Sequence, residues 1–546
     1  MLSLAFCLAA AAVLRLALVW SLDLRGSFGP DAPGAAAAAF TGPFRHPYPL
    51  HPLLIRVFSA LVGDPSQGAL LLSLTAGMAA VAAAWLLGRV LTAERDGRAM
   101  GLVAAASPLL VQVSLLGGGD ALAIALAWWG VALGWWGARA QERAPEVDGW
   151  ARAAVVAGGA LWGLSAAAKP IALPAGAFLL LAPLFGDRRS LPWLGAGLGV
   201  GVVLALPFLR PLLLPLPDHG LLGSWWNGGV PSPTEWPRWA ARGIVTVLRT
   251  AWNHPWSQIA PLGAVAVAGG VVAGPRRLAR LGLVGVAFAV PLGVAAMLGS
   301  RLMPRYLAGA SLGWVLLAGM ALTPAVFRVP PVRPMGPWRI MLGPLPLSLG
   351  IALLAMSSLR FWEGMASLRV QEEGTAPPRG VIGDWPETWA PTEAYQDSSL
   401  CGALELERLA TDLARDLPRG GTVVSLPLRD GRTWHLFGPL AVARPDLHLV
   451  ALTAGCCPAG PEACAAALPR ALAESGGGVL VVPLLPDGRC ATGALADDLE
   501  PWQRALRPSI RQEHVWFGTL GQDPVTGTAE LCSALGGRAP QAPARP

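Results

Sequence analysis

The stretch GGGDALAIALAWWGVALGWWGA, residues 117–138, decides the class of this protein. After Asp120 it continues to Ala138 without a charged side chain. A helix needs about 20 mostly apolar residues to cross the hydrocarbon layer of a bilayer, so this stretch predicts a membrane span. Asp120 then lies at one end of the span, where a carboxylate is costly and needs an explanation.

The rest of the chain also has the composition of a membrane protein. Of its 546 residues 53% are hydrophobic and 14% are charged, whereas about 25% are charged in a soluble domain. The mean hydropathy is +0.50. Further apolar stretches predict a polytopic α-helical bundle of about eleven transmembrane helices within residues 1–359. The predicted spans are residues 2–22, 67–91, 101–116, 121–138, 153–168, 171–185, 194–209, 257–273, 281–298, 306–327 and 340–359.

The arginines between these spans predict the orientation of the chain. If the N-terminus is cytoplasmic, every inside loop carries arginine, as the positive-inside rule expects. The outer loops 23–66 and 210–256 also contain arginine, so the pattern is a bias. No run or stripe of basic residues indicates nucleic acid, and the net charge of +7 is attributed to topology. Residues 2–22 lack a basic segment before them and a cleavage site after them, which predicts a retained helix in the plasma (inner) membrane.

The part after residue 359 has a different pattern and falls on the outer side. Short apolar strands alternate with helical stretches, which predicts a soluble α/β domain over residues 360–537, followed by a disordered tail at 538–546. Six of the seven cysteines lie in this part, and an even set predicts disulfides in an oxidising compartment. Metal binding is the alternative, although no Cys-x-x-Cys pair supports it. The predicted strands are 422–426, 447–452, 478–482 and 514–517, and the predicted helices are 403–417, 461–473 and 495–506.

Polar residues that solubility does not explain collect on the predicted outer side of the bundle. Ionisable groups at membrane depth cost about 2.5–3.5 kcal/mol, so they tend to pair and to line a cavity. The candidates are Asp31, His46 and His51 in the first outer loop and its continuation, Asp120, Lys169, and the group Arg301, Arg305 and Tyr306.

Each candidate also has a simpler explanation. Asp120 could cap the helix that it opens, and Lys169 could be a snorkelling anchor. The two arginines could contact lipid phosphates, and the histidines, which stand among prolines, could be turn residues. A tryptophan-rich stretch at 218–236 could anchor at the membrane interface or stack on a sugar.

The order of these residues resembles the GT-C glycosyltransferases, membrane enzymes that include protein O-mannosyltransferases and lipid A aminoarabinose transferases. In that family a large outer loop with an acidic residue leads through a Tyr-Pro-x-x-x-Pro-like stretch to an interfacial helix. Asp31 and the stretch PYPLHPLL, residues 47–54, occupy these places. Further similarities are DALA at 120–123, GLSAAAKP at 163–170 and RYL at 305–307, so the resemblance covers about the first 330 residues.

The resemblance implies an inverting transfer of a sugar from a polyprenyl-phosphate carrier to an acceptor hydroxyl on the extracytoplasmic face. Asp31 would be the general base, and Asp120 would orient a donor hydroxyl or pair with a cation. The cations that stabilise the phosphate leaving group would be Lys169, Arg301 and Arg305. His46 and His51 would contact the acceptor, which could be a lipid, a protein or a glycan.

No cofactor is assigned from the sequence. Many members of the family carry a second acid near the loop aspartate, whereas Asp31 is followed by Ala32 and Pro33, with Asp23 upstream. A divalent metal therefore has few candidate ligands here. Two other functions stay open, a transporter or lipid flippase and a non-catalytic scaffold with an outer sensing domain. A transporter is expected to show internal repeats, and none is evident in the sequence.

Overall fold

The computed structural model describes the greater part of the apolar region and short stretches of the C-terminal part. The described residues are 2–21, 35–36, 39, 48–92, 97–143, 148–213, 233–253, 277–299 and 304–322, and, in the C-terminal part, 410, 413–415, 417, 419, 422–425, 437, 440, 443–444, 446–452, 456–474, 479–481 and 535. The predicted spans 257–273 and 340–359, the strand 514–517, the helix 495–506 and the tail lie outside them.

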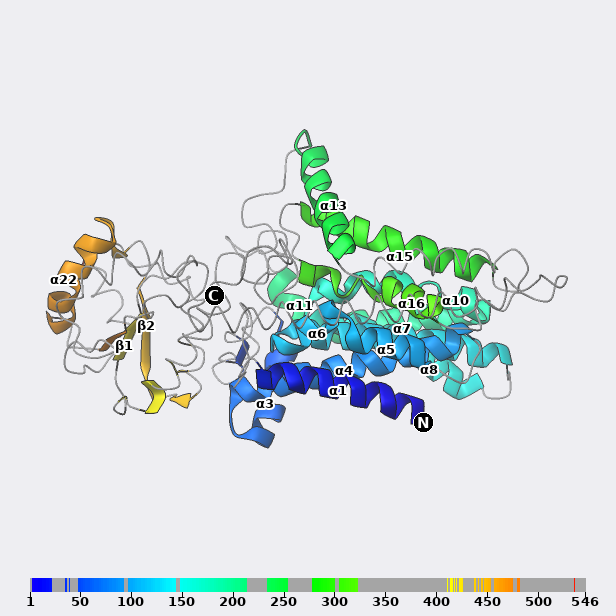
Figure 1. Ribbon diagram of the computed structural model, residues 1–546, viewed down its shortest axis with the longest axis horizontal. Coiled ribbons are helices and arrows are strands. Elements are labelled where there is room, and N and C mark those ends of the chain that lie inside the picture. The colour runs from blue at the N-terminus through cyan, green and yellow to red at the C-terminus, as the bar shows by residue number, and fades with distance from the viewer. Residues whose placement is uncertain are drawn as a thin grey trace, which may run out of the picture.

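Long helices that run side by side form a bundle, which fills the larger part of Figure 1. Within the described residues six helices are long and apolar enough to cross a membrane, or up to seven if one bent pair counts as a span. The six are α1 (Leu2–Ser21), α4 (Pro65–Thr92), α7 (Gly119–Arg143), α8 (Asp148–Ala168), α11 (Leu191–Leu213) and α15 (Arg277–Leu298). Six of the predicted spans coincide with these helices, whereas the total of about eleven stays a prediction.

Prolines explain where the described helices depart from the predicted spans. The span predicted at 101–116 is the bent pair α5 (Arg98–Ala106) and α6 (Pro108–Leu115), whose axes differ by 57°. The span predicted at 171–185 is broken, because proline removes a backbone donor and clashes with the preceding turn. Its pieces are η3 (Pro170–Ala175), α9 (Gly176–Leu179) and α10 (Ala182–Phe185), followed by η4 (Arg188–Ser190).

The remaining elements of the bundle are shorter or polar on one side. The predicted interfacial stretch after the first outer loop is a helix, α3 (Leu50–Val62), which buries His51 and Ile55 and exposes Val57 and Leu61. The others are α13 (Trp236–Asn253), η6 (Pro304–Leu307) and α16 (Leu312–Ala321). In Figure 1, α13 stands at a steep angle to α15.

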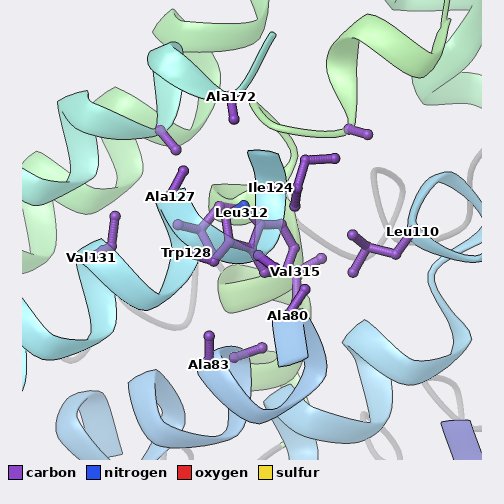
Figure 2. Close-up of a cluster of buried hydrophobic side chains, with 14 of the residues drawn as sticks. Ala80, Ala83, Leu110, Ile124, Ala127, Trp128, Val131, Ala172, Leu312 and Val315 are labelled. Carbon is purple, nitrogen blue, oxygen red and sulfur yellow. The ribbon is translucent and has the colours of Figure 1, made fainter. Parts of the chain in front are cut away.

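Small residues allow close helix packing in the bundle, and Trp128 fills space between its helices. Where α8 meets α11, a Cβ on Gly163 would lie 2.4 Å from the Cα of Gly201, so these backbones pack too closely for any side chain. At the centre Trp128 of α7 is fully buried and its indole N–H donates to the Gly309 carbonyl at 3.4 Å. Figure 2 shows Trp128 surrounded by side chains from α4, α6, η3 and α16.

The described C-terminal residues contain a three-stranded parallel sheet in the order β2-β1-β3. The strands β1 (Thr422–Ser425), β2 (His448–Ala451) and β3 (Val479–Val481) and the helix α22 (Pro461–Glu474) lie at predicted positions. The wider prediction of a soluble α/β domain stays a prediction.

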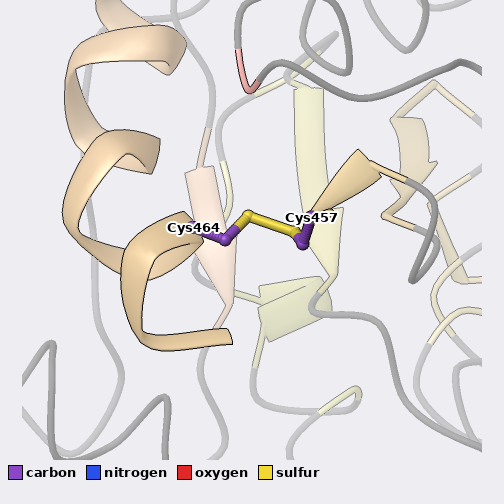
Figure 3. The surroundings of a disulfide bond; sticks show 2 residues. All are labelled: Cys457 and Cys464. Atoms are coloured by element: carbon purple, nitrogen blue, oxygen red, sulfur yellow. A yellow bond between two sulfur atoms is a disulfide. The ribbon is translucent and has the colours of Figure 1, made fainter. Parts of the chain in front are cut away.

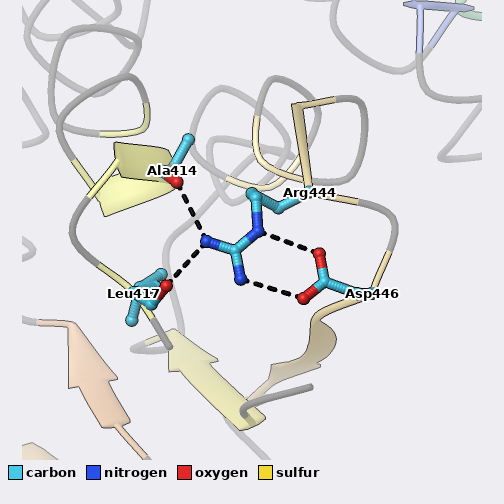
Figure 4. A network of polar contacts seen from close by, with 4 residues as sticks. All are labelled: Ala414, Leu417, Arg444 and Asp446. Carbon is cyan, nitrogen blue, oxygen red and sulfur yellow. Dashed lines mark hydrogen bonds and ion pairs between the residues drawn. The ribbon is translucent and has the colours of Figure 1, made fainter. Parts of the chain in front are cut away.

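A disulfide and a set of hydrogen bonds stabilise this sheet region. Cys457 and Cys464 form a disulfide at the start of α22 (Figure 3), and Cys456 is disulfide-bonded as well. Arg444 donates two hydrogen bonds of 2.9 Å to the carboxylate of Asp446 and further bonds to the carbonyls of Ala414 and Leu417 (Figure 4). The hydrogen bond to Asp446 raises the pKa of Arg444 above its ordinary value.

Candidate functional site

A buried ion pair joins the start of α7 to the end of α8. The ammonium nitrogen of Lys169 lies 3.0 Å from each carboxylate oxygen of Asp120. The side chains are 9% and 1% exposed, respectively. Removing two charges from water costs several kcal/mol per ion, and their mutual attraction offsets this cost only with good geometry. Lys169 is the single lysine of the chain, which makes this placement notable.

A tight turn places Asp120 in this pair. α6 ends at Leu115, and Gly117 adopts a left-handed conformation with φ of 68°, which glycine reaches without strain. The hydroxyl of Ser73 in α4 donates to the Gly118 carbonyl at 3.1 Å and holds the turn. A Cβ on Gly119 would lie 2.8 Å from the Ala168 carbonyl oxygen, so the two helix ends meet backbone to backbone.

A helix end and a proline place Lys169. α8 ends at Ala168, and Lys169 has an extended backbone before Pro170 opens η3. The residue before a proline is driven out of the helical region, which turns the Lys169 side chain out of the α8 direction. Asp120 and Lys169 are 49 residues apart in the sequence, and their pairing depends on a glycine turn beside one and a proline break beside the other.

His51 lies next to the pair. Its side chain is buried in α3, with a residue exposure of 1%, and a Cβ on Gly119 would lie 3.5 Å from its Cβ and Cγ atoms. Among the predicted site residues, the structure therefore brings together Asp120, Lys169 and His51.

The segment of Tyr306 packs against η3, the short helix that follows Lys169. A Cβ on Gly309 would lie 2.7 Å from the Ile171 carbonyl oxygen and 3.0 Å from the Cα of Ala172. η6, which contains Arg305 and Tyr306, also contacts α6. Tyr306 is half-buried, and the backbone of Arg305 lies in η6. The side chain of Arg305 and the residues Asp31, His46 and Arg301 lie outside the described parts.

Arg15 is a buried cation that is not among the site residues predicted from the sequence. Arg15 in the middle of α1 is 1% exposed and donates to the carbonyl of Ala105 at 3.0 Å. A lone charge inside an otherwise apolar span was the signal that could have found it.

A metal centre is not evident in the described part of the chain. No group of three or more histidine, cysteine, aspartate and glutamate side chains there could hold an ion. Asp23 and Asp31 are outside that part.

Known proteins resemble this chain in one segment of the sequence and in the fold. Residues 45–210, which contain the ion pair and His51, match the family model described as dolichyl-phosphate-mannose-protein mannosyltransferase. No curated protein matches the chain in sequence. Solved structures do match. ArnT from Cupriavidus metallidurans, bound to undecaprenyl phosphate, has 19% sequence identity and a TM-score of 0.50 over 82% of this chain and 85% of that chain.

The chain has a GT-C-like fold. The same ArnT in the apo state matches with 18% identity and a TM-score of 0.50, over the same 82% and 85% of the two chains. The oligosaccharyltransferase of Archaeoglobus fulgidus in its apo form has 14% identity and a TM-score of 0.46, over 87% of this chain and 67% of that chain. The resemblance to the GT-C glycosyltransferases, which the sequence motifs predict, is thereby confirmed. In the GT-C-like bundle the family match covers α3 to α11 and ends before α13.

Proposed function

We propose that the protein is a membrane glycosyltransferase that transfers a sugar from a polyprenyl-phosphate carrier to an acceptor on the extracytoplasmic face. The observation that carries this proposal is the buried pair of Asp120 and Lys169, which lies inside the segment that matches the mannosyltransferase model. The binding of undecaprenyl phosphate by ArnT supports a lipid-linked donor. A buried charge pair at one end of a bundle is costly, which favours a role for it with a polar ligand.

In the proposed reaction the leaving group is a lipid phosphate, whose developing negative charge needs preorganised cations. Lys169 is proposed as one of these cations, and Arg301 and Arg305 are proposed to bind the phosphate with it. An ammonium has three N–H donors, so Lys169 can keep its bond to Asp120 and still donate to a phosphate oxygen. Asp120 thus orients the ammonium group of Lys169, and the pair as a whole carries no net charge.

Asp31 is proposed as the general base. It would accept the proton of the acceptor hydroxyl while that oxygen attacks the anomeric carbon from the face opposite the phosphate, which inverts the configuration. The C–O bond to the phosphate breaks, and the phosphate keeps the electron pair. His46 and His51 are proposed to contact the acceptor, and His51 lies beside Gly119, the residue before Asp120.

The C-terminal part is proposed to be an extracytoplasmic domain of a multi-pass plasma-membrane protein with a cytoplasmic N-terminus. The disulfide between Cys457 and Cys464 supports an oxidising compartment for this part. A domain on that side would cover the site or meet the acceptor.

Sugar transfer from a radiolabelled polyprenyl-phosphate-sugar pool in membranes tests the proposal. We expect wild type and Arg89→Gln to transfer equally, because Arg89 is exposed and lies over the Trp85 ring of the same helix. Asp31→Asn and Lys169→Met should each lose at least 100-fold in rate, the usual scale for an acid–base or electrostatic group. Equal transfer by Asp31→Asn would remove Asp31 from the mechanism.

Amine labelling gives a second readout that does not need the correct sugar. Because Lys169 is the only lysine, an amine-reactive probe reports on it alone apart from the N-terminus. Undecaprenyl phosphate should slow the labelling of Lys169 and leave the N-terminus unaffected. Labelling that undecaprenyl phosphate leaves unchanged would argue against a phosphate site at Lys169.

A further inference from the structure

Arg15 is a buried cation that the proposed chemistry does not use. It lies in α1 with a residue exposure of 1%. Its Nη1 atom donates to the carbonyl of Ala11 one turn earlier, at 3.3 Å, and to the carbonyl of Ala105 in α5, at 3.0 Å. Among the described residues its Nε and Nη2 atoms have no hydrogen-bond partner. A packed apolar side chain would be easier to bury, so the guanidinium needs a reason.

The break between α5 and α6 supplies that reason. In an unbroken helix the carbonyl of Ala105 would accept from the N–H of Leu109, four residues later. Ser107 is extended, Pro108 opens α6, and the 57° bend turns the next helix away. The Nη1 atom of Arg15 therefore occupies the acceptor at the C-terminal end of α5, where the helix dipole also favours a positive charge.

The same guanidinium touches the elements that lead to the ion pair. A Cβ on Gly77 of α4 would lie 3.3 Å from the Nε of Arg15, and it would also overlap the Ser114 hydroxyl of α6. Ser114 in turn donates to the Leu110 carbonyl within α6. The guanidinium is thus packed where Gly77 of α4 meets Ser114 of α6.

α6 is a short helix, and only the Gly117 turn separates it from Asp120. It also contacts η6, the helix of Arg305 and Tyr306. A change in the direction of α6 therefore moves both sides of the proposed phosphate site. An eight-residue helix has little stability of its own, so its direction depends on the contacts at its two ends.

We propose that Arg15 is a positioning residue that closes the broken end of α5, fixes the direction of α6 and so sets the place of Asp120 against Lys169. This inference rests on the proposed function where it concerns the rate of transfer, and on the geometry alone where it concerns α6. In the proposed mechanism Arg15 contacts neither the sugar donor nor the acceptor. It acts through the turn at Gly117.

Local hydrogen exchange tests the geometric part. Arg15→Met keeps the length of the side chain and removes its donors, and Arg15→Lys keeps a charged donor. We expect Arg15→Met to raise exchange at least tenfold in peptides that cover residues 107–120, with Arg15→Lys in between. Peptides from the middle of α8 should match wild type, and the control Arg89→Gln should match wild type throughout.

Gly77→Ala is a second route to the same pattern, because its methyl group displaces the Ser114 hydroxyl and presses on the guanidinium. If Arg15→Met does not fold, Arg15→Lys and Gly77→Ala still decide the outcome. Unchanged exchange over residues 107–120 in the variants that fold overturns the proposal. A rise that is equal in α8 also overturns it, because it would mean a general loss of stability.

A double-mutant cycle tests the link to Asp120. Arg15→Met should lower transfer at least tenfold in wild type and less than threefold in an Asp120→Asn background, because both changes disturb the same pair. Effects that multiply would show that Arg15 acts elsewhere, and the positioning role would fall. If wild type transfers no sugar, the proposed function fails, and the exchange measurements still decide the role of Arg15.

Discussion

Two of the ion pairs in the described part of the chain join a cation to a carboxylate in opposite surroundings. Lys169 and Asp120 lie 49 residues apart, are nearly excluded from water and join two helix ends. Arg444 and Asp446 lie two residues apart and are 17% and 37% exposed. The exposed pair forms between near neighbours in the sequence, and Arg444 also donates to the carbonyls of Ala414 and Leu417.

The two pairs differ in the free energy that their burial costs. An exposed pair loses little water when it forms, so it costs little and contributes little. A buried pair is often no more stable than an apolar replacement, so its presence needs a reason beyond stability. Substitutions should therefore cost about 3–5 kcal/mol at the buried pair and less than about 1 kcal/mol at the exposed pair.

The largest effect is expected from removing one member of the buried pair. Asp120→Asn removes the carboxylate that lies 3.0 Å from the buried ammonium of Lys169, which should destabilise the bundle by about 3–5 kcal/mol. Denaturant titration of the purified protein in mixed micelles measures this change. A loss below about 1 kcal/mol would mean that water or another anion reaches Lys169, and the contrast with the exposed pair would weaken.

Removing both charges of the buried pair sharpens the same comparison. Asp120→Leu combined with Lys169→Met should recover most of the stability lost in Asp120→Asn, because neither charge is then left alone. Sugar transfer should stay at least 100-fold below wild type. Recovery of stability without activity would separate the two roles of the pair, whereas recovery of both would remove it from the proposed site.

A smaller effect is expected at the backbone contact beneath the pair. Gly119→Ala places a methyl group 2.8 Å from the Ala168 carbonyl oxygen, so α7 and α8 must separate by a few tenths of an ångström. Overpacking of this kind costs about 1–3 kcal/mol. The matched control is Gly149→Ala, where a Cβ meets nothing within 4 Å, and it should match or exceed wild type in the same titration.

The smallest effect is expected at the exposed pair. Asp446→Asn should lower the local stability of β2 by less than about 1 kcal/mol, as measured by hydrogen exchange of peptides over residues 446–452. Because the pKa of Arg444 is raised, its contribution is present at neutral pH and is lost only as pH rises through that alkaline pKa. An Arg444 contribution to the exchange-derived stability that changes between pH 6 and pH 9 would contradict this assignment.

Much of the fold could be predicted from local patterns. The spans at α1, α4, α7, α8, α11 and α15 follow from runs of apolar residues, and the strands β1, β2 and β3 from short β-branched runs between turn residues. The stretches predicted as spans at 101–116 and 171–185 contain prolines, and in the structure the helix is bent or broken there. Mean hydropathy is averaged over a window of residues and does not register the backbone N–H that proline lacks.

The candidate site could be predicted only in part. Asp120 and Lys169 were recognisable because each stands at the edge of an apolar run, but the sequence left a cap and a snorkelling anchor as equal explanations. Arg15 was hidden inside the first span. Its acceptor, the carbonyl of Ala105, lies 90 residues away, and no local pattern relates the two.

The sequence by itself determined that this is a membrane bundle, which residues would be costly there, and the resemblance to GT-C enzymes, because solvent preference and motif order are written along the chain. Only the tertiary structure decided that Asp120 and Lys169 pair, that His51 lies beside them and that Arg15 closes the end of α5. Burial and pairing depend on contacts between helices distant in sequence, and these contacts form only when the glycine turns and proline breaks have placed the helix ends together.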